Sequence, residues 1–217
     1  MNGLDRIQLI RDSGVIAIMR AKNSEQLIAA ASAIRQGGVR VIEVTMTTPG
    51  ALEVIAAASK QFGEDVLFGA GTVLDPETAR AAILAGAQFV VAPTLKVETI
   101  QLCKRYGVPV MPGCLTPTEM LTAWEAGADF VKLFPAEFGG PEMVKAILAP
   151  LPQLRIVPVG GVDLNTAGAF MRAGAAALGV GGSLVNQKLL DSADFGELTR
   201  RAGAFIEEVQ QGRALKI

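Results

Sequence analysis

The sequence predicts an α/β fold, a single (β/α)8 TIM barrel with an extra N-terminal helix, formed by residues 1–217 as one domain. Hydrophobic residues make up 50% of the chain and charged residues 19%, which provides material for one large core. Short apolar runs alternate with helical stretches that end in glycine, at Gly38, Gly63, Gly86, Gly107 and Gly127. Apolar strands separated by helices form parallel sheets covered on both faces, and eight such units close into a barrel.

Eight apolar runs are expected to form the strands. They lie near residues 15–19, 39–45, 66–70, 88–92, 108–112, 129–134, 155–159 and 176–180. The expected helices include Ser24–Gln36, Pro76–Ala85, Val97–Arg105 and Thr118–Ala126, with N-caps at Ser24, Asp75 and Thr116. Met1–Asp12 should cover the bottom of the barrel, and Phe195–Gln210 is the last outer helix. The alternative is a doubly wound open sheet, which would have fewer strands and usually one dominant glycine-rich first turn.

The charge balance excludes several classes of partner. Twenty Lys and Arg against 21 Asp and Glu give a net charge of −1, so there is no polybasic surface for nucleic acid or an anionic membrane. No apolar stretch approaches the roughly 20 residues of a membrane span. The charged opening MNGLDRIQLI is unlike a secretion signal, and we expect a cytoplasmic protein in which Cys103 and Cys114 are ordinary buried thiols.

The complete absence of histidine restricts the chemistry. Catalysis by Ser-His-Asp or Cys-His groups is excluded, and so are the usual zinc sites with imidazole ligands. A magnesium site would need clustered carboxylates at strand ends, and the sequence shows no such cluster. Cys114 has no histidine to activate it, so a nucleophilic role is not expected. We therefore expect no metal and no cofactor.

Two charged residues, Glu43 and Lys132, stand inside strands where apolar residues are expected. Each falls in a row of alternate residues that should face the barrel interior. Glu43 shares its row with Val39, Val41 and Thr45, and Lys132 shares its row with Phe130 and Phe134. One interpretation is a structural ion pair, because buried pairs do occur. The other is catalytic, because burial lowers the pKa of a lysine and supplies a neutral amine that can form an imine, while a carboxylate moves protons.

Two glycine-rich segments, PVGGV at 158–162 and GVGGSLV at 179–185, follow the last two expected strands. In a (β/α)8 barrel the loops after strands seven and eight commonly bind phosphate through backbone N–H groups. Ser183 adds a hydroxyl donor at this place. The alternative is that the glycines only permit tight turns between strand and helix. They are Gly160, Gly161, Gly181 and Gly182.

Polar residues are also expected at other strand ends. Arg20 follows the first strand, Thr72 lies in GAGTV after the third, and Pro93 and Thr94 close the fourth. A guanidinium at a strand end can recognise a carboxylate through two hydrogen bonds, although Arg20 could equally be a solvated loop cation.

Five longer segments carry a resemblance: EVTMTTP (43–49), GAGTVL (69–74), APTL (92–95), MPGCLTPTE (111–119) and KLFPAE (132–137). Together with PVGGV and GVGGS, they resemble the KDPG/KHG aldolase family, the class I 2-keto-3-deoxy-6-phosphogluconate aldolases, along essentially the whole chain. The resemblance implies a homotrimeric barrel, without cofactor, that reversibly splits a keto-acid phosphate into pyruvate and glyceraldehyde 3-phosphate. Related members also accept 4-hydroxy-2-oxoglutarate.

The resemblance implies roles residue by residue. Lys132 matches the imine-forming lysine, Glu43 the general acid and base, and Thr72 the contact to the pyruvyl carboxylate. Phe134 is similar to the aromatic wall beside the lysine. The positions that match phosphate-binding turns are Gly160, Gly161, Gly182 and Ser183.

Two positions depart from the pattern of some members. Thr47 stands where gluconate aldolases often carry an arginine, so the resemblance implies that Arg20 binds the carboxylate instead. Val159 stands where those enzymes often have threonine and galactonate 6-phosphate aldolases have valine, which leaves the C4 configuration of the substrate open. The residues expected to line the substrate pocket are Thr47, Pro93, Phe134 and Val159.

Two other functions remain as alternatives. One is a phosphosugar isomerase or epimerase of similar build, in which Glu43 is a base and Lys132 only an electrostatic clamp. The other is a non-catalytic phosphometabolite-binding barrel, in which the two charges form a structural pair.

Overall fold

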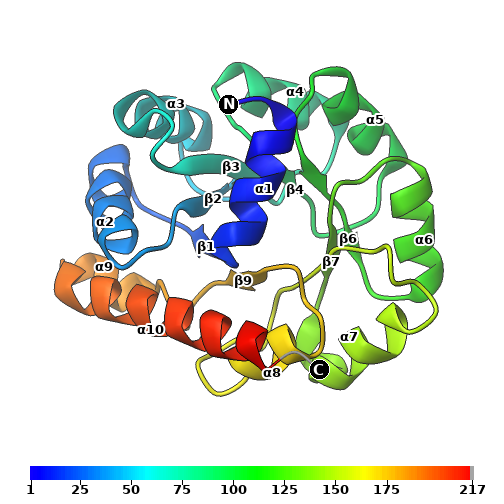
Figure 1. Ribbon diagram of the computed structural model, residues 1–217. Coiled ribbons are helices and arrows are strands. Elements are labelled where there is room, and N and C mark those ends of the chain that lie inside the picture. Colours follow the sequence, from blue (N-terminus) through cyan, green and yellow to red (C-terminus); the bar gives the residue numbers. More distant parts are fainter. Residues whose placement is uncertain (216–217) are drawn as a thin grey trace.

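The computed structural model describes residues 1–215, which form a curled parallel sheet surrounded by helices (Figure 1). The strands are β1 (Val15–Met19), β2 (Val41–Thr45), β3 (Leu67–Gly71), β4 (Val90–Val91), β5 (Val110–Met111), β6 (Gly113–Cys114), β7 (Val131–Leu133), β8 (Ile156–Pro158) and β9 (Leu178–Val180). The helices are α1 (Gly3–Ser13), α2 (Ser24–Gln36), α3 (Ala51–Phe62), α4 (Pro76–Leu84), α5 (Val97–Arg105), α6 (Pro117–Glu125), η1 (Ala136–Phe138), α7 (Gly140–Leu148), α8 (Ala167–Arg172), α9 (Gln187–Asp191) and α10 (Phe195–Ala214). The alternation of apolar runs and helices is therefore confirmed.

The strands form two hydrogen-bonded groups rather than the single ring of eight expected from the sequence. Six strands follow the order β5-β4-β3-β2-β1-β9, and three follow the order β6-β7-β8, all parallel. The expected strand 108–112 is shortened to β5, and a further strand, β6, follows Pro112, which has no N–H to donate. A single bridge between Val159 and Gly179 links the chain after β8 to β9.

Alternate residues of the strands pack into two separate clusters. Val15, Ala17 and Met19 of β1 pack with the surrounding helices, whereas Ile16 and Ile18 belong to a smaller cluster that contains no residue of α2 to α10. This smaller cluster is the concave interior of the sheet. Its other fully or nearly fully buried members are Ile10, Val41, Leu67, Phe89, Val91, Met111, Phe130, Val157, Val159 and Ala177.

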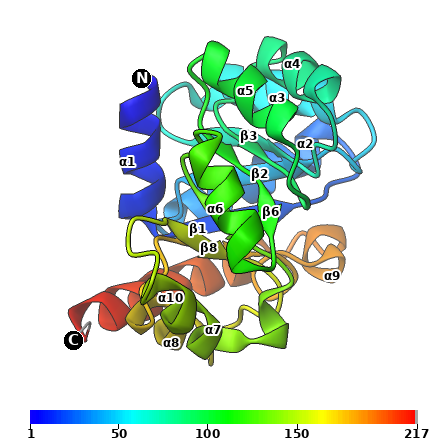
Figure 2. The same cartoon turned by 90° about the vertical axis from the view of Figure 1, so that its right-hand side faces the viewer.

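Helix α1 lies at one end of the strands, and α9 lies at the opposite end (Figure 2). Ile10 of α1 is fully buried in the inner cluster, and Ile7 and Leu9 pack against it. The helix begins with Asn2, whose side chain accepts from Asp5 N at 3.0 Å in a capping box. Helix α1 thus covers the interior near the start of the strands and leaves the carboxyl ends uncovered by it.

Two details of the predicted elements are wrong. Val39 does not share the inner row of Glu43, because strand β2 begins only at Val41 and Val39 packs into the outer cluster, where its N–H donates to Ile34 O at 3.2 Å. Helix α2 is capped by Asn23 rather than Ser24, because the Asn23 side chain accepts from Gln26 N at 2.9 Å. The caps at Asp75 and Thr116 are confirmed.

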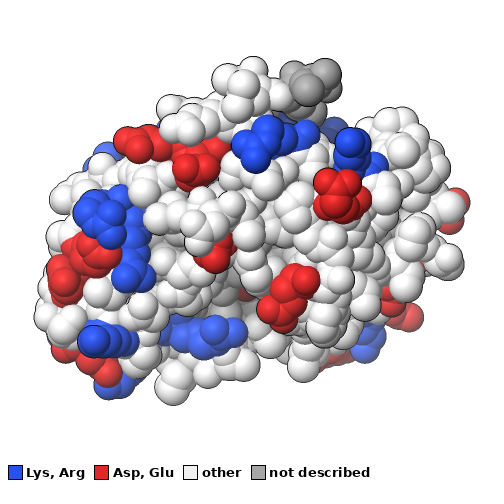
Figure 3. All heavy atoms as spheres, turned by 90° about the horizontal axis from the view of Figure 1, so that it is seen from below, with Lys and Arg blue, Asp and Glu red and all other residues white. Residues whose placement is uncertain are grey.

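A cleft of about 1110 Å³ opens away from the carboxyl ends of the strands, between the ends of α1, α7, α8 and α10. The basic residues on its wall that lie in the last turns of these helices are Arg11, Lys145, Arg172 and Arg213. Cations at helix C-termini offset the partial negative charge of the helix dipole, so the fold itself accounts for this basic lining. Seen from below, basic and acidic side chains are interspersed (Figure 3). Within residues 1–215 no helix has the length and apolar character needed to cross a bilayer.

Candidate active site

Lys132 lies in the middle of β7 and faces the interior of the sheet. Its neighbours Val131 and Leu133 belong to the outer cluster, whereas Phe130 belongs to the inner one. On the adjacent strands Lys132 is aligned with Gly113 and Val157. The side chain is 5% exposed, and its Nζ lies 4.7 Å from the centre of the Phe134 ring. The expectation of an interior lysine against an aromatic face is confirmed.

Glu43 lies on β2 and faces the same interior as Val41, with 2% of its surface exposed. Its carboxylate occupies the space above Gly71, where a Cβ would fall 1.8 Å from Oε1 and 2.5 Å from Cγ. Any side chain at position 71 would therefore displace the carboxylate. The sequence placed GAGTV at the end of the third expected strand but did not reveal this contact, because the register that brings Gly71 beside Glu43 is not a local property of the chain.

Lys132, Glu43 and Arg20 form one electrostatic group. Burial lowers the pKa of Lys132, and the positive charge of Arg20 lowers it further, while Glu43 opposes both effects. Burial raises the pKa of Glu43, against the opposing effects of Lys132 and Arg20. Within residues 1–215 no hydrogen bond or ion pair joins Lys132 to Glu43. Burial therefore shifts both groups toward their uncharged forms.

The predicted carboxylate contacts lie around these two residues. Arg20 is exposed directly after β1, and its charge acts on both Lys132 and Glu43. Thr72 follows β3 with φ of 59°, a left-handed conformation that is strained for a β-branched residue. Strain of this kind collects at functional sites, where the surrounding structure holds it in place. Thr47 is exposed, and its Oγ1 lies 2.9 Å from Oγ1 of the buried Thr45.

The other predicted pocket residues lie on the strands that flank Lys132. The backbone of Pro93 packs closely on Gly113, where a Cβ would fall 2.3 Å from the Pro93 carbonyl, and Gly113 is aligned with Lys132. Phe134 is 36% exposed, and Nζ of Lys132 lies over its ring. Val159 belongs to the inner cluster and is 8% exposed. The Val159 side chain fits only because residue 179 is glycine, since a Cβ there would fall 2.5 Å from Cγ2 of Val159.

The two glycine-rich segments differ in what the backbone requires. Gly160 and Gly161 have φ of 92° and 70°, so the turn after β8 needs glycine at both positions. After β9, Gly181 and Gly182 have no positive φ, and a Cβ there would meet nothing within 4 Å. The tight-turn interpretation therefore explains the first pair and not the second. Within residues 1–215 the backbone N–H groups with no protein acceptor include those of Gly161, Gly182 and Ser183.

The two thiols are buried and unreactive. Burial raises the pKa of Cys103 and of Cys114 to about 12. A thiol with such a pKa is almost entirely protonated at neutral pH and is a poor nucleophile. Among residues 1–215 no group of three or more Cys, Asp or Glu side chains is arranged to hold a metal ion. The interior thus offers Lys132 as the nucleophile with the most favourable environment.

A family model described as KDPG and KHG aldolase matches residues 7–201. The chain belongs to this family. A 2-dehydro-3-deoxy-phosphogluconate aldolase of Treponema pallidum is 40% identical over 187 residues, covering 85% of this chain and 88% of that protein. A 2-dehydro-3-deoxy-6-phosphogalactonate aldolase of Escherichia coli is 37% identical over 78% of this chain and 83% of that protein.

Solved structures agree with membership of the KDPG and KHG aldolase family. A KDPG aldolase from Legionella pneumophila, captured with pyruvate as a covalent carbinolamine intermediate, superposes with a TM-score of 0.85. It is 29% identical, and the superposition covers 92% of this chain and 97% of that chain. As a member of this family, the chain is a carbon–carbon lyase of the aldolase type.

Proposed function

We propose that the protein is a Schiff-base aldolase that cleaves 2-keto-3-deoxy-6-phosphogluconate into pyruvate and glyceraldehyde 3-phosphate. The observation that carries the proposal is the interior placement of Lys132, whose pKa is lowered by burial, beside a separate buried carboxyl group on Glu43. We extend it to 4-hydroxy-2-oxoglutarate, because the same amine can condense with the ketone of any such 2-keto acid.

In the first steps the neutral amine of Lys132 attacks the C2 ketone and forms a carbinolamine. The Glu43 carboxyl group donates a proton to the departing hydroxyl, water leaves, and a protonated imine remains. The uncharged amine that begins the reaction is favoured by burial of Lys132 and by the nearby charge of Arg20. The aromatic face of Phe134, 4.7 Å from Nζ, stabilises the positive charge that develops on the imine nitrogen.

Cleavage then breaks the bond between C3 and C4 of the substrate. The Glu43 carboxylate takes the proton of the C4 hydroxyl, C4 becomes the aldehyde carbon of the departing product, and the bonding electrons flow into the imine to give an enamine. Glu43 returns a proton to C3, and water hydrolyses the imine to release pyruvate and the free amine. No step in this sequence needs a metal or an organic cofactor.

Substrate binding in this proposal uses both ends of the pocket. Arg20 and Thr72 bind the pyruvyl carboxylate, because a guanidinium at a strand end can hold a carboxylate through two hydrogen bonds. Gly160, Gly161, Gly182 and Ser183 bind the phosphate through backbone N–H groups, of which those of Gly161, Gly182 and Ser183 have no protein acceptor in residues 1–215. Thr47, Pro93 and Val159 line the space between these ends.

A second candidate substrate is the C4 epimer, 2-keto-3-deoxy-6-phosphogalactonate. One observation favours it: position 159, in the inner cluster, is valine, the residue that galactonate 6-phosphate aldolases have there. Both substrates give the same products, so the chemistry of Lys132 and Glu43 is common to them. The isomerase alternative lacks a comparable observation, since a lysine that acts only as a positive clamp would gain nothing from a lowered pKa.

We extend the proposal to the architecture and assembly of the protein. The two groups of strands, joined at Pro112 and at the bridge between Val159 and Gly179, are the parts of one closed (β/α)8 barrel that forms a single domain. Phe138 is 76% exposed and Trp124 is 45% exposed, and such apolar surface supports burial in a homotrimer. We place the protein in the cytoplasm, where Cys103 and Cys114 remain reduced.

Reductive trapping tests the proposed function. Incubation of the protein with pyruvate and borohydride should add one reduced pyruvyl group to Lys132, detected by peptide mass spectrometry, and a coupled assay should measure pyruvate release from both phosphorylated epimers. Lys132→Met should abolish trapping and turnover, while Lys104→Met, which removes a lysine paired with Asp129, should retain both. Absence of a trapped adduct in a folded, active wild type would favour the isomerase alternative.

A further inference from the structure

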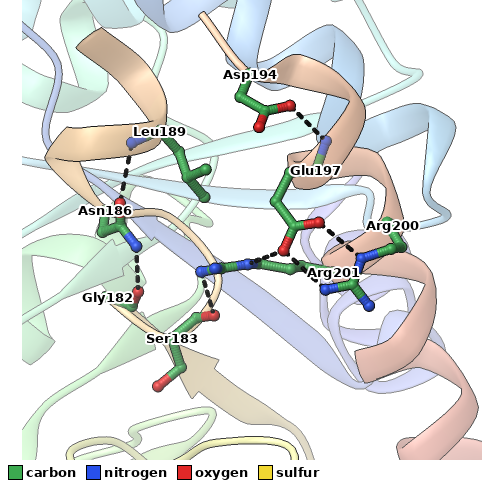
Figure 4. A network of polar contacts seen from close by, with 8 residues as sticks. All are labelled: Gly182, Ser183, Asn186, Leu189, Asp194, Glu197, Arg200 and Arg201. Atoms are coloured by element: carbon green, nitrogen blue, oxygen red, sulfur yellow. Dashed lines mark hydrogen bonds and ion pairs between the residues drawn. The ribbon is translucent and has the colours of Figure 1, made fainter. Parts of the chain in front are cut away.

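The side chains of Arg201 and Asn186 donate hydrogen bonds to backbone carbonyls of the turn after β9 (Figure 4). Arg201 of α10 donates from Nη1 to the carbonyl of Ser183 at 3.2 Å. Asn186 donates from Nδ2 to the carbonyl of Gly182 at 3.5 Å, and its Oδ1 accepts from Leu189 N at 3.0 Å. Two successive carbonyls of the turn are thus drawn toward side chains of the surrounding protein.

These contacts fix which way the N–H groups of the turn point. A trans peptide is planar, and its C=O and N–H point in opposite directions. Because the Gly182 carbonyl points to Asn186, the N–H of Ser183 points the other way, and it has no protein acceptor in residues 1–215. The Ser183 carbonyl bound by Arg201 orients the next peptide, whose Leu184 N–H donates to Gly181 O at 2.9 Å.

The turn has little conformational rigidity of its own. Gly182 and Ser183 are exposed, and glycine at 181 and 182 leaves the backbone free to adopt many conformations. A flexible loop would have to be ordered when it binds an anion, at a cost in affinity. The two side-chain contacts reduce that cost, because they hold the carbonyls in place before the ligand arrives.

Glu197 holds Arg201 in the orientation that reaches the turn. Its Oε1 accepts from Arg201 Nε at 2.8 Å, one turn of α10 before Arg201. The same carboxylate accepts two hydrogen bonds from Arg200, at 2.7 Å each, and these contacts lower the pKa of Glu197 to about 2. Arg201 reaches across to Ser183, whereas Arg200 lies on the other side of Glu197 (Figure 4).

We propose that Arg201 is a positioning residue for phosphate binding, which acts by fixing the backbone of Gly182 and Ser183. This role rests on the proposed function, in which that turn binds the phosphate of the substrate. Arg201 contacts the carbonyl of Ser183, whose peptide carries the Leu184 N–H bonded to Gly181 O, so it fixes the turn that bears the Gly182 and Ser183 donors without touching the ligand. Its planar guanidinium suits the task because it donates to Glu197 and to Ser183 at once, from two nitrogens in fixed relation.

Steady-state kinetics on two substrates test this role. The phosphorylated substrate is 2-keto-3-deoxy-6-phosphogluconate or its C4 epimer, and the comparison substrate is 4-hydroxy-2-oxoglutarate, which has no phosphate. Arg201→Met should raise KM for the phosphorylated substrate about tenfold, the effect expected when a charge-assisted contact is lost, with kcat within about twofold. Its kcat/KM for 4-hydroxy-2-oxoglutarate should stay within about twofold of the wild-type value.

Arg200→Met is the matched control, because it removes the neighbouring arginine and its pair with Glu197 but no contact to the turn. Arg200→Met should leave KM and kcat unchanged for both substrates. Arg201→Lys provides a second variant, in which one ammonium cannot make both contacts in the same geometry, and its KM should fall between those of wild type and Arg201→Met. Thermal melting of all three variants should match wild type, since solvated ion pairs contribute little to stability.

The outcomes separate this role from the proposed function. A wild type that releases pyruvate from neither substrate refutes the proposed function and this role with it. If the wild type cleaves both substrates and Arg201→Met leaves KM for the phosphorylated one unchanged, the positioning role alone is refuted. Equal losses on both substrates would likewise refute it, because they would show a general structural effect of Arg201.

Discussion

The carboxylate of Glu43 fills the space that a side chain on Gly71 would need. A Cβ at Gly71 would lie 1.8 Å from Oε1 and 2.3 Å from the carboxyl carbon of Glu43. The two residues lie on neighbouring parallel strands, where Glu43 is aligned with Gly69 and Thr45 with Gly71. Because both side chains cannot occupy one volume, glycine at position 71 determines where the proposed proton-transfer group can sit.

Gly71→Ala should therefore impair catalysis while the protein stays folded. The methyl group would push the Glu43 carboxyl group away, and a displacement of about 1 Å in a catalytic group can cost about 100-fold in rate. We expect kcat to fall by about that factor in a pyruvate-release assay. Gly196→Ala, where a Cβ would meet nothing closer than 3.9 Å, is the control and should retain activity. Full activity of Gly71→Ala would mean that Glu43 tolerates displacement or has no part in the chemistry.

The pH dependence of turnover should report the environment of Lys132. Its pKa is lowered from 10.5 by burial and by Arg20, so the neutral amine forms at lower pH than in an exposed lysine. We expect kcat/KM to rise with pH as Lys132 loses its proton, with an apparent pKa below 10.5. Arg20→Gln should move this rise to higher pH, because it removes a neighbouring positive charge. A rise centred at or above 10.5 in the wild type would contradict the assignment.

The buried charges should reduce the stability of the protein. Because the pKa of Lys132 is lower in the folded protein than in the unfolded chain, its burial destabilises the fold below the folded pKa. This destabilisation disappears as pH rises toward 10.5, the ordinary pKa of lysine. Because the pKa of Glu43 is higher in the folded protein than in the unfolded chain, its burial destabilises the fold at higher pH. This destabilisation disappears as pH falls toward 4.5, the ordinary pKa of glutamate. The double variant Glu43→Gln, Lys132→Met should thus be more stable at neutral pH by about 1–4 kcal/mol, the size of effect found when buried charged residues are replaced by uncharged ones.

Calorimetric melting of wild type and the double variant at pH 7 measures this difference, which should appear as an increase of several degrees in Tm. The double variant should also be inactive. A decrease in Tm would indicate that the two charges stabilise the fold, as the non-catalytic alternative requires.

Removal of the Arg20 guanidinium should weaken binding of the keto acid. Arg20→Met should raise KM for both the phosphorylated substrate and 4-hydroxy-2-oxoglutarate by about 10- to 100-fold, because a hydrogen bond to a charged group is lost. Both substrates should be affected, since the carboxylate is common to them. Arg11→Met, in the last turn of α1 and lining the cleft away from the carboxyl ends, is the control. An unchanged KM in Arg20→Met would assign Arg20 to the solvated surface.

Val159 should influence the choice between C4 epimers. Val159→Thr adds a hydroxyl group to the inner cluster, and a hydroxyl can hydrogen-bond the C4 substituent in only one of the two configurations. We expect the ratio of kcat/KM for the gluconate over the galactonate phosphate to rise about five- to tenfold. The coupled pyruvate assay on both epimers provides the ratio. An identical ratio in the variant would remove Val159 from the residues that determine specificity.

Local patterns in the sequence predicted much of this molecule. Apolar runs after helix-ending glycines located the strands, and two charges in those runs, Glu43 and Lys132, identified the interior site. The errors were also local. Val39 precedes the first residue of β2, so the alternation of inward and outward side chains did not apply to it. Asn23, rather than the neighbouring Ser24, is the N-cap of α2.

The tertiary structure alone decided how the side chains meet. Gly71 lies beside Glu43 only because β2 and β3 pair in one register, and Arg201 reaches Ser183 only because α10 packs behind the turn after β9. Strand register and helix packing are set by contacts between residues far apart in the chain, whereas periodicity reports only neighbours within a few residues. The sequence by itself therefore determined the element types and the residues with unusual chemistry, and the fold determined their partners.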